Sequence, residues 1–297
     1  MDKLSEIVSS VKSDIEGFEA KLKEIILKDD NFLRNHLDEF MFSNPKRLRP
    51  IFVYLFSKIL DIKNETVDNI ALAVELVHSA SLVHDDIIDE ADLRRSKQTF
   101  YSKFGSKIAV LEGDFLLALA LEVLSNCPNE IVKIFSGKIK ETLLGELNQN
   151  YNLNKIQTID EYVLKTLPKT TNLFAAGLDS LFCLKKTDDN TKDALINFME
   201  NYSIAFQIKN DINDIKLDKS SDLQCGNYTL PVIYFCLDKK IKSFEIDIFN
   251  KEKEKYVAMA VHKMNEYKKS AIEYLNKIEN SIFKKELLEL SEFTLRS

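Results

Sequence analysis

The chain has 297 residues, 45% of them hydrophobic, and a formal net charge of −6. This length can bury a large core, and the hydrophobic content is ordinary for a globular protein. The acidic balance argues against a nucleic-acid partner, because nucleic-acid-binding domains present a basic face to phosphates.

Helical periodicity runs through the sequence from its start. Apolar residues recur every three to four positions between Leu4 and Ile25, which predicts a helix there. No segment alternates with period two, and no linker rich in Gly, Ser or Pro divides the chain. The predicted fold class is therefore all-α, with residues 1–297 in a single domain. The same spacing predicts the later helices at roughly 32–42, 46–60, 66–90, 105–126, 129–150, 158–183, 190–217, 227–238 and 251–279.

The cysteines and the N-terminus indicate a cytoplasmic protein. Cys127, Cys183, Cys225 and Cys236 are scattered without a C-x-x-C pair, which predicts reduced thiols. The first residues lack the basic start and apolar block of a signal peptide. The most apolar stretch, 109–124, contains three acidic residues, so we expect a buried core helix there and not a membrane span.

The strongest chemical signal is a cluster of acids followed by two arginines. Asp85 and Asp89 are one helical turn apart and share a face, with Asp86 beside them. Acids this close repel each other unless a cation neutralises them. Magnesium takes oxygen ligands from one or two carboxylates and leaves positions for phosphate oxygens. Arg94 and Arg95 follow, and guanidinium groups suit the recognition of phosphate. This pattern predicts a diphosphate site.

A second acidic motif repeats the spacing of the first. Asn210, Asp211 and Asp214 place oxygen ligands at i, i+1 and i+4. Two such helices that face each other can hold magnesium around one diphosphate and neutralise it as a leaving group. A single acidic cluster is more often a solvated helix face. Two spaced motifs, each flanked by apolar and basic residues, favour the metal site.

With these motifs in this order, the chain resembles the trans-polyprenyl diphosphate synthase family over roughly residues 30–240. Members of that family condense isopentenyl diphosphate onto an allylic diphosphate. The resemblance implies an all-α bundle around a central hydrophobic cavity, a magnesium-dependent transferase of prenyl groups, and a homodimer. By this match the metal ligands are Asp85, Asp86, Asp89, Asn210, Asp211 and Asp214, and they hold about two or three Mg²⁺ ions.

The resemblance also assigns the basic residues. The segment 45–50 resembles the family's Gly-Gly-Lys-Arg-Leu-Arg-Pro element. That match implies that Lys46, Arg49, His78 and Arg95 bind the diphosphate of isopentenyl diphosphate. Without the resemblance, the basic segment would be interpreted as a surface helix start and the histidine as a core residue.

The resemblance also assigns the residues that bind the allylic substrate. Arg94, Lys169, Thr170 and Gln207 would bind its diphosphate, and the last three would also contact the developing cation as catalytic residues. Loss of the diphosphate leaves carbocation character at the terminal carbon, which the double bond of isopentenyl diphosphate attacks. The released diphosphate is the expected base. Catalysis then rests on positioning and on charge stabilisation.

Two small residues on the first motif's helix bear on product length. Ala80 and Ser81 lie one turn before Asp85, roughly 6–7.5 Å below the metals. Family members with short products often carry aromatic residues there. The small residues predict an open tunnel and a medium- to long-chain all-trans product, although for either residue alone ordinary core packing is the better interpretation.

The sequence departs from the family pattern at several places. Asn210 replaces an aspartate, so its affinity for the third magnesium should fall. Residues 215–221 form a shorter segment than usual after the second motif, and Asn227 replaces a lysine. Asn44 and Pro45 replace the Gly-Gly pair, and proline stiffens that turn.

Three other assignments compete with a homodimeric synthase. A terpene synthase has no need of Lys46, Arg49 and the other residues assigned to isopentenyl diphosphate. A partner or regulatory subunit of a heteromeric synthase would typically lose the first acidic motif, which is intact here, but the altered second motif keeps this alternative open. A head-to-head synthase also lacks an isopentenyl site. A long product is very apolar, so at most a transient membrane association is expected.

Overall fold

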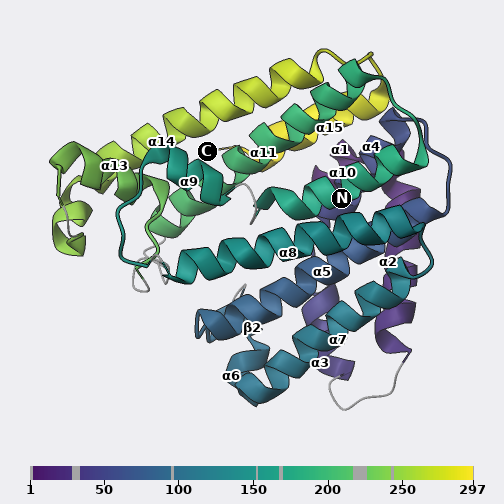
Figure 1. Ribbon diagram of the computed structural model, residues 1–297, viewed down its shortest axis with the longest axis horizontal. Helices are drawn as coiled ribbons and strands as arrows, with labels where there is room; N and C mark the ends of the chain where they lie inside the picture. Colours follow the sequence, from purple (N-terminus) through teal and green to yellow (C-terminus); the bar gives the residue numbers. More distant parts are fainter. Residues whose placement is uncertain are drawn as a thin grey trace. The chain divides into compact units, whose positions relative to one another are not determined.

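The computed structural model describes residues 3–28, 34–94, 97–151, 153–166, 170–216, 226–241 and 244–296 (Figure 1). Within these ranges the regular structure is helical apart from two short strands. The all-α prediction is confirmed. The chain divides into two compact units, and the prediction of a single domain over residues 1–297 stays a prediction. The first unit contains residues 1–136, 176–187 and 281–287, and the second contains 137–175, 188–280 and 288–297.

The first unit is organised around one long buried helix. This helix, α5, packs along α7 and also contacts α4 and α6 (Figure 1). The elements of this unit are α1 (Lys3–Ile7), the 3-10 helix η1 (Ser9–Val11), α2 (Lys12–Leu27), α3 (Arg34–Phe42), α4 (Leu48–Ile59), α5 (Thr66–Ile88), the antiparallel strands β1 (Leu93–Arg94) and β2 (Lys97–Gln98), α6 (Phe100–Phe104) and α7 (Ser106–Leu124).

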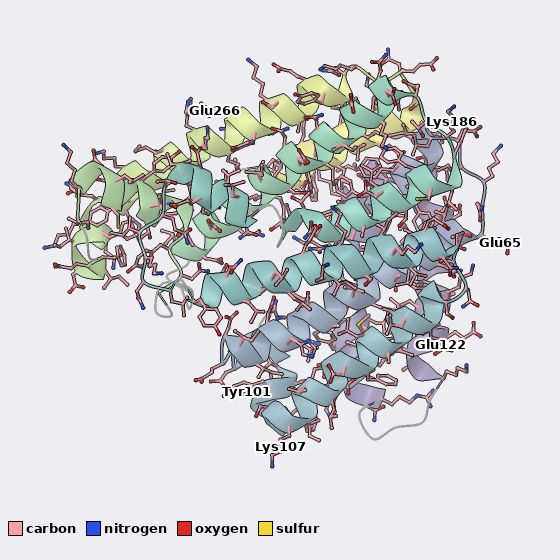
Figure 2. All side chains as sticks on the ribbon, viewed as in Figure 1. Glu65, Tyr101, Lys107, Glu122, Lys186 and Glu266 are labelled. Atoms are coloured by element: carbon pink, nitrogen blue, oxygen red, sulfur yellow. The ribbon has the colours of Figure 1, made fainter. Side chains whose placement is uncertain are left out.

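Helices α5 and α7 approach each other closely because α7 carries small residues on its buried face. Ala109, Gly113 and Ala120 lie on this face and are buried. A Cβ atom at Gly113 would lie 2.2 Å from Nε2 of His84, so no larger residue fits without displacing the imidazole. The side chains of Lys107 and Glu122, near the two ends of α7, are exposed (Figure 2).

Helix α5 is apolar along most of its length. Among the described residues it is the one helix long and apolar enough to cross a membrane, with a mean hydropathy of 1.2 over its best window. However, 67% of that window is buried inside the protein. Core helices pass the same length and composition test, and the packing against α4 and α7 accounts for the apolar character of α5.

The second unit is built on two long helices, α11 and α14, that pack along each other (Figure 1). Phe198, Tyr202 and Phe206 stack along α11, with ring centroids 6.0 and 5.9 Å apart. Its helices are α9 (Ile159–Thr166), α11 (Asp189–Lys216), α13 (Leu230–Lys239) and α14 (Ile246–Leu275). Three more helices contain residues of both units: α8 (Asn129–Tyr151), α10 (Asn172–Leu184) and α15 (Ile282–Thr294).

Apart from their exact ends, the predicted helices match the structure with five differences. The helix predicted between Leu4 and Ile25 is divided into α1, η1 and α2. The segment 158–183, expected as one helix, contains α9 and α10 as separate helices. Pro168 stands between them in sequence, and a proline inside a helix removes a hydrogen bond and clashes with the preceding turn. Helices α6 and α15 were not predicted. The short β1–β2 pair was also missed, since two-residue strands carry no measurable periodicity.

One buried acid in α7 makes stability depend on pH. Glu112 is 3% exposed, and its Oε1 accepts no hydrogen bond from the described residues. Burial raises the pKa of Glu112 from its ordinary 4.5 to about 7. The folded protein therefore keeps this proton between these pH values while the unfolded chain loses it. The stability that this group contributes is present below pH 4.5 and is lost as the pH rises through 7.

We predict that Glu112→Gln increases the free energy of unfolding at pH 8 by about 2 kcal/mol and has little effect at pH 4.5. Urea unfolding at the two pH values measures the difference. Glu122→Gln, at an exposed position of the same helix, is the control and should change neither value. An equal gain at both pH values would contradict the assigned titration.

Candidate active site

The first acidic motif lies at the C-terminal end of α5. The amide of Asp89 donates to the carbonyl of Asp85 at 2.8 Å, so the two residues are one helical turn apart. Asp85 is half-buried and Asp89 is exposed. The last turn of α5 contains no basic residue. Carbonyl groups at a helix C-terminus carry partial negative charge, so acids there are unfavourable without a cation. The donor chemistry of this helix end suits a hard metal ion.

Asp86 is more deeply buried than Asp85 and Asp89, and it forms an ion pair. Its Oδ1 accepts a hydrogen bond from Nε of Arg94 at 2.8 Å, and only 2% of the residue is exposed. Burial raises the pKa of Asp86, with a contribution from the charge of Asp89, while Arg94 opposes the shift. The pair therefore joins β1 to the end of α5. About 30% of the Arg94 side chain remains exposed. Arg95 lies outside the described residues.

The basic segment before α4 forms a turn with two left-handed residues. Asn44 has φ 56° and Arg47 has φ 50°. Glycine adopts this conformation freely and asparagine more readily than other residues, so Asn44 can stand where the family pattern has glycine. Lys46 is exposed and Arg49 is half-buried at the N-terminal end of α4, where a helix favours anions. His78 is half-buried on α5.

The second acidic motif lies on α11, and its middle acid is buried in a hydrogen-bond network. Asp211 is 3% exposed. Its Oδ2 accepts from the hydroxyl of Tyr162 at 2.6 Å and from the amide of Leu230 at 3.2 Å. Its Oδ1 accepts from Nε2 of Gln207 at 2.9 Å. The carboxylate thus links α9, α11 and the start of α13. Sequence reasoning missed Tyr162, whose only signal was helical spacing.

The network extends to a predicted catalytic residue. The hydroxyl of Thr170 donates to Oε1 of Gln207 at 2.9 Å. Because the hydroxyl proton of Thr170 is used in this bond, the lone pairs of its oxygen remain to face a positive charge. The structure brings these two predicted residues together. Lys169 and residues 217–225 lie outside the described residues.

The two acidic motifs share one arrangement. In each, the second residue is buried and hydrogen-bonded, as the contacts of Asp86 and Asp211 show. The first and fifth residues are more exposed; in the second motif Asn210 and Asp214 are both half-buried. Within the described parts of the chain no three His, Cys, Asp or Glu side chains converge into a ready metal site. Two oxygen donors per motif leave coordination positions for diphosphate and water, which is how magnesium is usually held.

Comparison with known proteins shows the family. The sequence profile of the polyprenyl synthetase family matches residues 30–290. A prenyl transferase of Cyanidium caldarium is 35% identical over 82% of this chain and 78% of its own length. Solanesyl diphosphate synthase 1 of Arabidopsis thaliana is 35% identical over 80% of this chain, which spans only 62% of that protein. Heptaprenyl diphosphate synthase component 2 of Bacillus subtilis is 32% identical, over 82% of this chain and 72% of its own.

Solved structures of similar proteins support the same family assignment. Heptaprenyl diphosphate synthase from Staphylococcus aureus superposes with a TM-score of 0.84 at 29% identity, over 96% of this chain and 97% of that one. Geranylgeranyl pyrophosphate synthase from Corynebacterium glutamicum, complexed with calcium and isoprenyl diphosphate, has a TM-score of 0.79 at 25% identity over 98% and 96%. The chain belongs to the polyprenyl synthetase family, a family of trans-prenyltransferases, as its motifs predicted.

The bond from Tyr162 to Asp211 predicts a stability effect. Tyr162→Phe removes one donor from a buried carboxylate and should lower the free energy of unfolding by about 2 kcal/mol, since hydrogen bonds to charged groups are strong. Urea unfolding monitored by circular dichroism measures this loss. Tyr151→Phe is the matched control, because Tyr151 is 82% exposed. Equal losses in the two variants would contradict the role of the network.

Proposed function

We propose that this member of the polyprenyl synthetase family is a magnesium-dependent synthase that joins isopentenyl diphosphate head to tail (1'-4) to an allylic diphosphate. Diphosphate is released, and the product is a medium- to long-chain all-trans polyprenyl diphosphate. The observation that carries the proposal is the shared arrangement of the acidic motifs. Each buries and hydrogen-bonds its middle acid and leaves its first and fifth residues more accessible.

Metal binding is assigned to the accessible members of each motif. Asp85 and Asp89 in the first unit, and Asn210 and Asp214 in the second, supply the oxygen donors. Bound magnesium supplies positive charge that stabilises the departing diphosphate. The Corynebacterium relative binds calcium, another hard cation, together with isoprenyl diphosphate, which supports this assignment. Asp86 and Asp211, also predicted as ligands, are proposed to support the other donors.

Binding of the allylic diphosphate is assigned to basic and polar residues near the two motifs. Arg94 retains exposed surface beside its bond to Asp86, and with Lys169 it is proposed to hold the allylic diphosphate. Thr170 and Gln207 face the developing cation with oxygen atoms fixed by the Asp211 network. No described residue is needed as the base in this scheme, because the released diphosphate accepts the proton.

The isopentenyl diphosphate site is assigned to residues of the first unit. Lys46 and Arg49 flank the start of α4, and His78 lies on α5. The exposed ammonium of Lys46 and the helix N-terminus together favour an anion. Arg95 completes the proposed set.

The chain is further proposed to form a homodimer in the cytoplasm, in at most transient contact with a membrane. Val110, Leu111 and Leu121 are 41%, 63% and 60% exposed on α7, and exposed apolar side chains that gather on one helix suit a protein interface. A second assignment, as one subunit of a heteromeric synthase, is favoured by the likeness to component 2 of the Bacillus enzyme. In both assignments the chain binds another protein subunit.

Incubation with radiolabelled isopentenyl diphosphate, magnesium and farnesyl diphosphate tests the function. We expect labelled products longer than the starter. Asp89→Asn should lower the rate about 100-fold or more, because it removes a charged metal ligand. The control is Asp92→Asn, an exposed aspartate three residues further along. Absence of labelled product from the wild-type chain would overturn the homomeric synthase. Product formed only after a partner is added would establish the heteromeric alternative, and unlabelled product from farnesyl diphosphate a terpene synthase.

Product length is tested at the residues before Asp85. Ser81 is half-buried, and its hydroxyl donates to the carbonyl of His78, whereas Ala80 is fully buried. Ser81 thus lies on the more open side. Ser81→Phe should shorten the product by at least one isoprene unit, as measured by chromatography of the dephosphorylated products. Ser81→Ala is the control and should preserve the length. Ala80→Phe should also shorten the product, at an additional cost in stability from overpacking. Unchanged lengths in both Phe variants would contradict the tunnel.

A further inference from the structure

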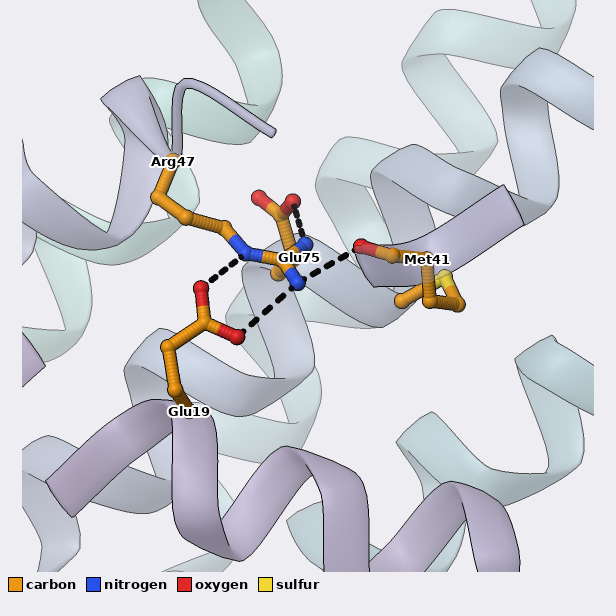
Figure 3. Close-up of polar contacts among 4 residues, drawn as sticks. All are labelled: Glu19, Met41, Arg47 and Glu75. Carbon is orange, nitrogen blue, oxygen red and sulfur yellow. Dashed lines mark hydrogen bonds and ion pairs between the residues drawn. The ribbon is translucent and has the colours of Figure 1, made fainter. Parts of the chain in front are cut away.

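Arg47, the residue between Lys46 and Arg49 of the basic turn, is almost completely buried. Only 5% of it is exposed. Its guanidinium makes four hydrogen bonds (Figure 3). Nε and Nη2 donate to the two carboxylate oxygens of Glu19 at 2.7 and 3.1 Å. Nη1 donates to Oε1 of Glu75 at 2.7 Å, and Nη2 also donates to the carbonyl of Met41 at 2.7 Å.

These bonds connect four helices of the first unit at one point. Glu19 belongs to α2, Met41 to α3 and Glu75 to α5, while Arg47 itself precedes α4 (Figure 3). The guanidinium also lies over the rings of Phe18 and Phe42, at 5.8 and 5.4 Å from their centroids. Burial opposes the charge, but the hydrogen bonds and charges of the two glutamates outweigh it and raise the pKa of Arg47. The residue is therefore a permanent cation.

The backbone of Arg47 needs this support. Its φ of 50° is left-handed, a conformation that is unfavourable for a residue with a side chain. The side chain does not cap α4. The bidentate bond to Glu19 and the bond to Glu75 keep the turn in this conformation. A lysine would keep the charge but lacks the planar fork that matches a carboxylate.

The position of this cluster relates it to the proposed substrate site. The turn that Arg47 holds carries exposed Lys46 on one side and Arg49 on the other. Glu75 lies three residues before His78 on α5, so the two share a helix face. One guanidinium thus fixes the basic turn to the helix that carries the third anion-binding residue.

We propose that Arg47 is a positioning residue for isopentenyl diphosphate. From beneath the surface it sets the geometry of Lys46 and Arg49 relative to His78. The inference rests on the proposed function and adds to it a residue and a buried cluster that themselves contact no substrate. It predicts a selective effect: loss of the cluster weakens the binding of isopentenyl diphosphate and leaves the allylic substrate unaffected.

The test compares steady-state kinetics of the full chain with both substrates. Arg47→Lys should raise KM for isopentenyl diphosphate about tenfold, with KM for farnesyl diphosphate and kcat within about twofold of the wild type. Glu19→Gln, at a partly exposed position, should still fold, and it should raise KM for isopentenyl diphosphate about threefold. Hydrogen exchange of the amides of residues 43, 44 and 46–49 should become faster in both variants.

Lys58→Met is the matched control, because Lys58 pairs with Asp14 at 3.0 Å and also joins α4 to α2. It should lower stability modestly and leave both KM values unchanged. An unchanged KM for isopentenyl diphosphate in Arg47→Lys, or an equal rise in both KM values, overturns the positioning role. A wild-type chain that does not consume isopentenyl diphosphate overturns the proposed function instead, so the two failures are distinct.

Discussion

Burial of charge among apolar helices is the constraint on which this structure depends. A charged group removed from water is tolerated only when it is hydrogen-bonded and, where possible, paired with an opposite charge. Asp86, Asp211 and Arg47 all satisfy this requirement, each with at least one partner from another element. Each pairing therefore also fixes the backbone near a residue that the sequence predicted for the site. Glu112 shows the other solution, since its burial, with no partner for Oε1 among the described residues, favours the neutral form.

The same constraint explains how the acidic motifs are organised. On a helix, the residues at i and i+4 share a face, and the residue at i+1 is rotated by about 100°. In both motifs that rotated residue faces the interior and is held by donors, which leaves the other two oriented away from it. A motif of three oxygen-bearing side chains thus contains two that are more accessible and one that anchors the helix. The contacts of the anchor differ between the units: Asp86 accepts from the guanidinium of Arg94, and Asp211 accepts from a tyrosine hydroxyl, a glutamine amide and a backbone amide.

The sequence predicted the parts of the fold that depend on local pattern. Helical spacing located most helices, and the i, i+1, i+4 spacing located both acidic motifs. It could not predict what the rotated acids contact, because Arg94, Tyr162 and Leu230 come from other elements. Nor could it separate Arg47 from its basic neighbours. Glu19 and Glu75 each lie 28 residues away from Arg47, and no periodicity links them. Helix α15 shows that even a regular segment can be overlooked near the end of a chain.

The bidentate partner of Arg47 has a consequence for domain boundaries. The family profile begins at residue 30, whereas Glu19 and Phe18 precede it. A fragment trimmed to the profile would retain every motif by which the family is identified, yet it would lose one of the two carboxylates and one of the two rings around the guanidinium. As hydrogen-bond partners Arg47 would then keep only Glu75 and the Met41 carbonyl. The packed unit around Arg47 therefore extends further toward the N-terminus than the region that the family profile matches.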